Sequence, residues 1–195
     1  MKIWSALLIL LIAPFSGIGQ EAYDKYTNYY SVEANVMTSF SGLGIQPTFG
    51  IYRDRHKIDV GIGIKAYDVW NDGPGILGTY LSYKIFPNQR KNDFSLFFGY
   101  HNVFSSHNKG KRFPVIYDEV ADKEVRPDKV LVMENMIGIG FEYQMGNRLY
   151  MLSDFSVGAA LKWNTFQDIE NQFEVTSTGM IRIGIGYNVG WKQAR

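Results

Sequence analysis

The chain has 195 residues, a formal net charge of +1 and no cysteine. This balance of charge argues against a nucleic-acid partner and against a polybasic membrane patch. The absence of cysteine excludes disulfides, thiolate metal ligands, a cysteine nucleophile and an acylated cysteine. The length corresponds to a single domain.

Residues 1–19 have the composition of a cleaved secretory signal peptide. Lys2 supplies the positive start, residues 3–15 are mostly apolar, and Gly17 and Gly19 are small residues before a cleavage site. The alternative is a single transmembrane anchor, but the apolar run is shorter than the roughly 18–20 residues that a membrane-spanning helix needs. Residues 20–28 are short and polar, and we interpret them as a tail.

Eight later segments alternate apolar residues with small or polar residues. They span 30–38, 44–52, 57–66, 75–86, 94–103, 133–145, 149–163 and 178–191. Successive side chains of a strand point to opposite faces, so each segment is predicted to be a strand with two different faces. In 75–86 the alternation places Leu77 on the apolar face. No segment has the period of an amphipathic helix.

The connections between these strands differ in length. Residues 53–56, 87–93 and 146–148 are the short ones, at one end of the predicted sheet. At the other end 39–43 is also short, whereas 68–74, 104–132 and 164–175 are longer. Tight turns at one end and long loops at the other are typical of an up-and-down membrane barrel.

Alternation alone does not decide which face is inside, because a soluble lipocalin-like barrel also alternates and turns its apolar face inward. Three observations favour the inverted, membrane arrangement. Eleven glycines lie on the non-apolar face, where a narrow lumen has little space. The strands reach the ~9–11 residues that cross a bilayer at a tilt. Aromatic residues on the apolar face gather near strand ends, as in interfacial girdles. The predicted girdle residues are Tyr30, Tyr83, Tyr100, Tyr143, Trp163, Tyr187 and Trp191.

This pattern resembles the small eight-stranded outer-membrane barrels of Gram-negative bacteria, of the OmpA membrane-domain and OmpX type. The last strand is similar to their C-terminal assembly signal in Gly184, Tyr187 and Trp191, although here four residues follow the tryptophan. The resemblance implies an all-β, eight-stranded antiparallel up-and-down transmembrane β-barrel over residues 29–191. It also implies an outer-membrane location, with a periplasmic tail at 20–28, periplasmic termini and extracellular long loops. The implied partners are outer-membrane lipid and lipopolysaccharide, the barrel-assembly machinery, and an extracellular ligand or envelope partner.

The face predicted to line the lumen carries acidic and basic residues in balance. Eight strands leave an interior just wide enough for side chains, so buried charges are expected to pair. The predicted ion-pair network contains Glu33, Asp59, Lys65, Lys84, Glu134, Glu142, Asp154, Lys162 and Arg182. The alternative reading of these charges is a narrow channel. No cofactor and no metal site is expected, since the histidines do not converge in the predicted topology.

His101 suggests an enzyme hypothesis, in which it activates Ser105 and is oriented by Glu134. Some outer-membrane barrels modify lipid A with a histidine-containing site. The His-x-Ser motif of the deacylase among them is absent here, where His101 is followed by Asn102 and Val103. The tail at 20–28 is too short and polar for the amphipathic helix of the acyltransferase. We therefore expect a non-enzymatic surface scaffold, adhesion or docking element that uses loop 104–132, with the enzyme and the channel as alternatives.

Overall fold

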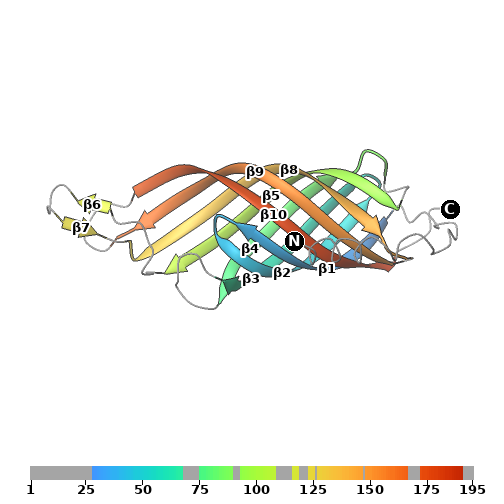
Figure 1. Cartoon of the computed structure of the whole chain (residues 1–195), viewed down its shortest axis with the longest axis horizontal. Coiled ribbons are helices and arrows are strands. Elements are labelled where there is room, and N and C mark those ends of the chain that lie inside the picture. Colours follow the sequence, from blue (N-terminus) through green and yellow to red (C-terminus); the bar gives the residue numbers. More distant parts are fainter. Residues whose placement is uncertain are drawn as a thin grey trace, which may run out of the picture.

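In the computed structural model the chain forms a closed, eight-stranded antiparallel barrel (Figure 1). The structure describes residues 28–67, 75–89, 93–108, 116–118, 123–125, 127–146, 148–166 and 172–190. The barrel strands are β1 (Asn28–Ser39), β2 (Gly42–Arg53), β3 (His56–Tyr67), β4 (Ile76–Ile85), β5 (Phe94–Asn108), β8 (Lys129–Gln144), β9 (Leu149–Thr165) and β10 (Gln172–Gly190). Consecutive strands pair in order, and β10 pairs with β1 to close the barrel. The predicted fold class is confirmed.

Two predictions from the sequence fall outside the described residues. These are the signal peptide at 1–19, with most of the tail, and the girdle residue Trp191. Among the residues that are described, no helix is long and apolar enough to cross a membrane.

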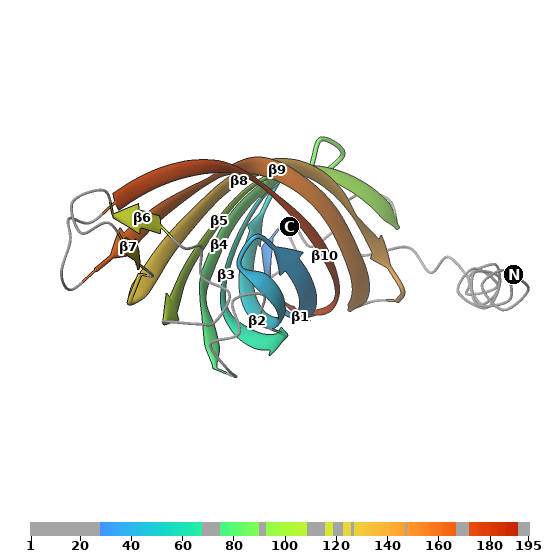
Figure 2. The same ribbon diagram turned by 60° about the vertical axis from the view of Figure 1, so that its left-hand side comes forward.

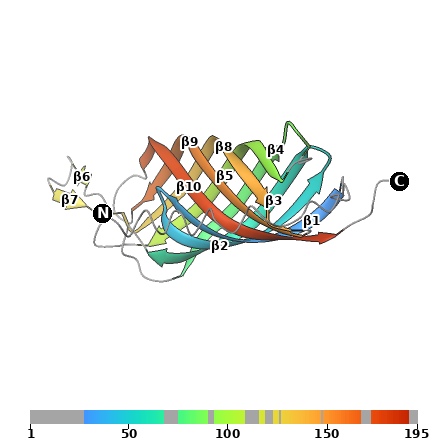
Figure 3. The same ribbon diagram turned by 45° about the vertical axis from the view of Figure 1, so that its right-hand side comes forward.

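The strands run obliquely around the barrel (Figure 3). Tyr30 of β1 pairs with Val189 of β10 across the seam. The other way round, the register from Tyr30 passes through Ile51, Ile58, Tyr83, Tyr100, Ile137 and Val157 to Gly179. A row of paired residues therefore climbs along the barrel as it circles it, which is the stagger that closure of tilted strands requires.

The apolar face of every barrel strand is on the outside. Val36, Ile139 and Ile183 are 53%, 60% and 55% exposed, whereas Lys57 and Arg182 on the inner face are 0% exposed. A water-soluble barrel would bury the first set and expose the second, because exposed charge and buried hydrocarbon are both favourable in water. The arrangement is that of a membrane barrel, in which the outer wall faces lipid.

Leu77 departs from the predicted alternation. Gly63 pairs with Gly78 and Ile64 pairs with Ile76, so Leu77 is an additional residue in β4. Such a bulge shifts the alternation by one residue, and Leu77 is buried in the lumen. The assignment of Leu77 to the lipid face is wrong for this reason, while Leu81 and Tyr83 beyond the bulge face outward as expected.

The strands are longer at the long-loop end than the sequence indicated. β5 and β8 stay paired up to Asn108 and Lys129, so the connection predicted as 104–132 is reduced to 109–128. Within it, β6 (Ile116–Asp118) and β7 (Lys123–Val125) pair as a small hairpin. This hairpin lies beyond the ends of β8, β9 and β10 (Figures 1 and 2). β10 likewise starts at Gln172 and not at Thr178.

Candidate functional site

The lumen is the part of the barrel that concentrates chemistry, and it is filled in layers. Along β8 from the short-turn end, the inward side chains are Glu142, then Met136, Glu134 and Val132. Glu142 belongs to a charged cluster, Met136 to an apolar layer, and Glu134 to a second polar cluster. On β8 the apolar Met136 thus lies between the two glutamates of these clusters.

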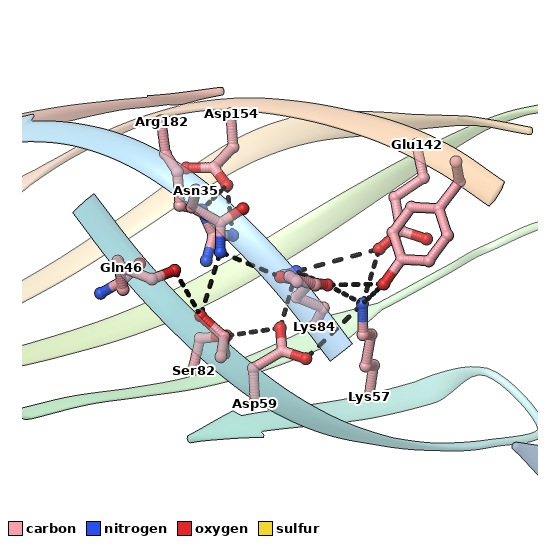
Figure 4. Close-up of polar contacts among 12 residues, drawn as sticks. Asn35, Gln46, Lys57, Asp59, Ser82, Lys84, Glu142, Asp154 and Arg182 are labelled. Carbon is pink, nitrogen blue, oxygen red and sulfur yellow. Dashed lines mark hydrogen bonds and ion pairs between the residues drawn. The ribbon is translucent and has the colours of Figure 1, made fainter. Parts of the chain in front are cut away.

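The first cluster joins Lys57 and Lys84 to three carboxylates (Figure 4). Lys57 Nζ donates to Glu33 and to Glu142 Oε1, the latter at 3.0 Å. Lys84 Nζ lies 2.6 Å from Asp59 Oδ2. These side chains are at most 1% exposed. Ion pairs of this kind are needed here, because an isolated charge in such a site costs several kcal/mol of desolvation.

Tyr150 extends this cluster to β9. Its hydroxyl donates to Glu33 Oε1 at 2.8 Å and accepts from Lys57 Nζ at 3.0 Å. The Lys57 ammonium also lies 5.0 Å from the centre of the Tyr150 ring, within the range of a cation–π interaction. The cluster thereby links β1, β3, β4, β8 and β9 through side chains alone.

Arg182 organises the next group of residues (Figure 4). Its Nε donates to Asp154 Oδ2 at 2.8 Å, a second guanidinium nitrogen donates to the same oxygen, and Nη1 donates to Tyr80 Oη at 2.5 Å. Tyr80 Oη also lies 2.7 Å from His101 Nδ1. A guanidinium can only donate hydrogen bonds, so the Tyr80 hydroxyl accepts from Arg182 and donates its own proton to His101 Nδ1. The carboxylate that Arg182 binds belongs to its paired residue on the adjacent strand β9, whereas the sequence suggested one across the lumen.

Glu134 lies at the centre of the second polar cluster. Its carboxylate accepts hydrogen bonds from the Ser39 hydroxyl at 2.9 Å, from the Ser41 hydroxyl at 2.5 Å and amide at 3.3 Å, and from Thr178. Ser41 belongs to the turn between β1 and β2. Glu134 therefore holds this turn inside the mouth of the barrel, where Ser41 is fully buried.

Four aromatic side chains fill the lumen at the short-turn end: Tyr29, Tyr52, Phe86 and Phe97. The rings of Tyr29 and Tyr52 stack with centroids 4.6 Å apart, and Phe86 lies 5.3 Å from Phe97. Their inward position follows from the period of two, but no local pattern indicates that they gather. Inward glycines make room for rings of this size, since a Cβ on Gly140 would collide with Phe97 and one on Gly186 with Tyr150.

The three residues of the enzyme hypothesis do not form one hydrogen-bonded unit. His101 is paired with Tyr80, and it lies in the middle of β5. Ser105 lies 3.1 Å from Nε2 of His107 and 2.8 Å from the hydroxyl of Ser41, which in turn donates to Glu134. The histidine that contacts Ser105 is therefore His107, two residues further along β5 on the same face, and not His101. Both side chains are fully buried.

The other residues of the predicted network lie nearer the long-loop end. Lys162 is half-buried and pairs with Glu174, 2.5 Å away. Lys65 is half-buried near the end of β3. Lys57 belongs to the first cluster, although the predicted network did not include it. Its alternation with Ile58 does place it on the inward face. Among the described residues, no group of three histidine or acidic side chains is placed to hold a metal ion.

The predicted girdle residues lie on the outer wall where the structure describes them. Tyr83, Tyr100, Trp163 and Tyr187 are 36–44% exposed. Tyr30 and Tyr143 are partly covered. Tyr83 contacts His56 through its hydroxyl at 2.6 Å, and Trp163 packs against Phe173 with ring centroids 5.3 Å apart. Tyr187 lies near the short-turn end of β10 and Trp163 near the long-loop end of β9, whereas Tyr100 pairs with Tyr83 and lies in the middle of β5.

Comparison with known proteins identifies the fold. The sequence matches no family profile and no curated protein. The N-terminal β-barrel domain of Pseudomonas aeruginosa OprF is similar in structure, with 13% identity and a TM-score of 0.54 over 84% of this chain and 99% of that one. A major outer membrane protein from Thermus thermophilus shows 14% identity and a TM-score of 0.44 over 84% and 100% of the two chains. The closed eight-stranded topology and the similarity to the OprF barrel show that the chain has the fold of the small outer-membrane barrels, as its sequence pattern predicted.

Proposed function

We propose that this protein is a non-enzymatic outer-membrane barrel that acts as a surface scaffold, with its long-loop end outside the cell. The observation that carries the proposal is the combination of a lipid-compatible outer wall with a lumen lined by buried, interacting side chains. Layers of paired charges, hydrocarbon and aromatic rings fill the interior. Such a lumen stabilises a rigid barrel and leaves the connections at its ends as the variable, binding part.

Membrane insertion is tested by heat-modifiable gel migration of the protein purified from the outer-membrane fraction. A folded barrel resists detergent at room temperature, so the unboiled protein is expected to migrate faster than the boiled one. An unchanged mobility on boiling, or recovery of the protein in the soluble fraction, contradicts the proposal.

Orientation is tested with single cysteines, because the natural chain has none. Lys129 at the start of β8 and Arg55 in the β2–β3 turn are both exposed and lie at opposite ends of the barrel. A membrane-impermeant maleimide added to intact cells is expected to label Lys129→Cys and not Arg55→Cys. Lysis before labelling should make both reactive. Labelling of Arg55→Cys alone in intact cells reverses the proposed orientation.

The scaffold role is assigned to the 109–128 connection, which carries the β6–β7 hairpin. Replacing residues 113–126 by a short Gly/Ser linker is expected to leave heat-modifiability unchanged, since the barrel pairs up to Asn108 and Lys129 without it. A strain with this variant should lose adhesion or envelope integrity to the extent that a deletion strain does. Full complementation by the shortened protein would show that this segment does not carry the scaffold role.

Two alternatives remain distinguishable by direct assays. The lipid-A-modifying enzyme is favoured by the contact between Ser105 and His107; it requires a change in the acyl count of lipid A on deletion that Ser105→Ala reproduces. The narrow channel is favoured by the charged lumen, and it requires single-channel conductance in a planar bilayer. Under the scaffold proposal, deletion of the protein leaves the mass of lipid A unchanged, and the planar bilayer shows no conductance steps.

A further inference from the structure

At the long-loop end β10 extends beyond β1, which leaves one side of β10 without a neighbouring strand. β10 starts at Gln172 and pairs there with β9, whereas its pairing with β1 starts only at Ile181, opposite Thr38. None of the described strands pairs with the other side of residues 172–180. Figures 1 and 2 show this part of β10 beyond the β1–β2 turn. This open edge is about 30 Å long, since a strand rises about 3.4 Å per residue.

The hydrogen-bond pattern of β10 decides which of its backbone groups point to the open side. The Asn188 amide donates to the Arg148 carbonyl of the β9 side at 2.8 Å. In an antiparallel ladder every second residue bonds to a given neighbour, and the pairing with β9 runs without a bulge to Gln172. Even-numbered residues of β10 thus bond to β9, and odd-numbered residues point their N–H and C=O groups to the other side. On the open edge these residues are Phe173, Val175, Ser177 and Gly179.

These backbone groups place the open edge outside the hydrocarbon of the membrane. An unsatisfied backbone group in lipid costs several kcal/mol, so the apolar layer ends near Ile181 on this side of the barrel. The β1–β2 turn does not cover the edge, because Glu134 holds Ser41 inside the mouth. Within the described part of the chain, the edge therefore faces the aqueous side.

The sequence of the edge lacks the features that keep strand edges from pairing. Natural edges are protected by proline, by lysine or by a bulge, and residues 172–180 contain none of these. Their one charged residue is Glu174, which pairs with Lys162 of β9. On the outer face Phe173 and Val175 are 55% and 61% exposed. They offer apolar area for contact with a further strand.

A second copy of the chain in the same membrane does not fit this edge. Two barrels in one membrane have the same orientation, so a two-fold axis between them runs along the membrane normal. Barrel strands tilt by about 35–45°, and two β10 edges related in this way would cross at roughly 70–90°. They would not lie side by side, as strand pairing requires. A segment of a soluble protein is free of this constraint.

We propose that residues 172–180 of β10 bind an extended segment of a soluble protein outside the cell as an additional antiparallel strand. In this mode of recognition main-chain hydrogen bonds supply the affinity, and alternate side chains supply the specificity. The segment has apolar side chains opposite Phe173 and Val175, and an aromatic one opposite Gly179, where the missing side chain leaves room. The inference rests on the surface location proposed above, and it adds a binding element distinct from the 109–128 connection.

A synthetic peptide with this pattern, acetyl-TFKTTVQVT-amide, tests the proposal on the purified barrel in phosphatidylcholine nanodiscs. Amide hydrogen exchange is followed by NMR. In the free protein the amides of Val175 and Ser177 are expected to exchange fast, whereas the Thr176 amide is protected by its bond to β9. Added peptide should protect Val175 and Ser177 and leave Thr176 unchanged.

Val175→Pro removes one N–H from the open edge and keeps the bonds to β9, at a position where strands tolerate proline. Val175→Ala is the matched control, because it loses the same side chain and keeps the N–H. The proline variant is expected to bind the fluorescein-labelled peptide about fivefold more weakly than the alanine variant, the size of one lost hydrogen bond. Equal binding to the two variants overturns the proposal. So does protection of Val175 and Ser177 in the free protein, or of neither with the peptide.

Heat-modifiability and the maleimide labelling of intact cells separate this inference from the proposed function. An unchanged mobility of the wild type on boiling, or labelling of Arg55→Cys alone, refutes the membrane barrel or its orientation. A folded and correctly oriented barrel that fails the peptide test refutes this inference alone. A cross-linked dimer in nanodiscs that Val175→Pro abolishes would assign the edge to a second copy and also overturn it.

Discussion

Arg182 and Tyr80 lie on diametrically opposed strands, and the arginine Nη1 donates to the tyrosine hydroxyl at 2.5 Å. β10 and β4 are four places apart in the ring of eight. The remaining guanidinium nitrogens that form bonds hold Asp154. One side chain thereby connects two opposite strands that share no backbone hydrogen bond.

Replacement of Arg182 by methionine is expected to destabilise the barrel by about 3–5 kcal/mol, because Asp154 stays buried without its cation. Tyr80→Phe removes one neutral hydroxyl, which accepts from Arg182 and donates to His101, and should cost less, about 1–3 kcal/mol. Urea unfolding in lipid vesicles, followed by the gel shift, measures both. Arg53→Met is the control, since the Arg53 side chain is 83% exposed and its change should be negligible. An Arg182→Met barrel as stable as the control would show that this ion pair is dispensable.

The period of two predicted the strands and which residues share a face, because each strand carries this alternation by itself. The inside-out polarity, and with it the inward position of Arg182, also needed the glycines on one face, the strand lengths and the aromatic residues near strand ends. Register between strands is not local, and it decides which inward residues meet. Arg182 and Tyr80 are 102 residues apart in sequence, and no feature of either segment indicates the contact.

The errors in the prediction have the same origin. Leu77 was assigned to the wrong face because a bulge adds one residue without any mark in the apolar pattern. His101 and Ser105 lie on one face, so alternation suggested a partnership. In the barrel the His101 side chain instead hydrogen-bonds to Tyr80 on the neighbouring strand β4. The turn at Ser41 points inward and places hydroxyl groups next to Glu134.

Glu134 is expected to control the β1–β2 turn. Glu134→Leu removes the acceptor of the Ser41 amide and hydroxyl, which should cost about 1–3 kcal/mol and raise the hydrogen-exchange rate of the Ser41 amide. Glu134→Gln keeps one carbonyl oxygen for these donors and should behave nearly as wild type. If the glutamine variant is as damaging as the leucine variant, the turn depends on the negative charge and not on the acceptor geometry.

Gly186 is expected to be irreplaceable because of the ring beside it. A Cβ there would collide with Tyr150, so Gly186→Ala should destabilise the barrel by about 1–3 kcal/mol. Gly179→Ala on the outer face of the same strand is the matched control, since its Cβ would lie an ordinary 3.4 Å from the nearest atom, the Ser156 carbonyl oxygen. In a Tyr150→Ala background the cost of Gly186→Ala should disappear. Persistence of the cost there would assign it to the backbone.

The lipid-facing wall gives the most direct test of the inside-out assignment. Ile183 is 55% exposed in the middle of β10, whereas Phe173 is equally exposed at the loop end of the same strand. In a bilayer, lysine at the middle of the wall is expected to cost about 2–4 kcal/mol and near the interface about 0–1 kcal/mol. Urea unfolding of Ile183→Lys and Phe173→Lys in vesicles should therefore differ by at least about 1 kcal/mol. In water both lysines would be solvated alike, so equal stabilities would mean that β10 does not cross the hydrocarbon of a membrane.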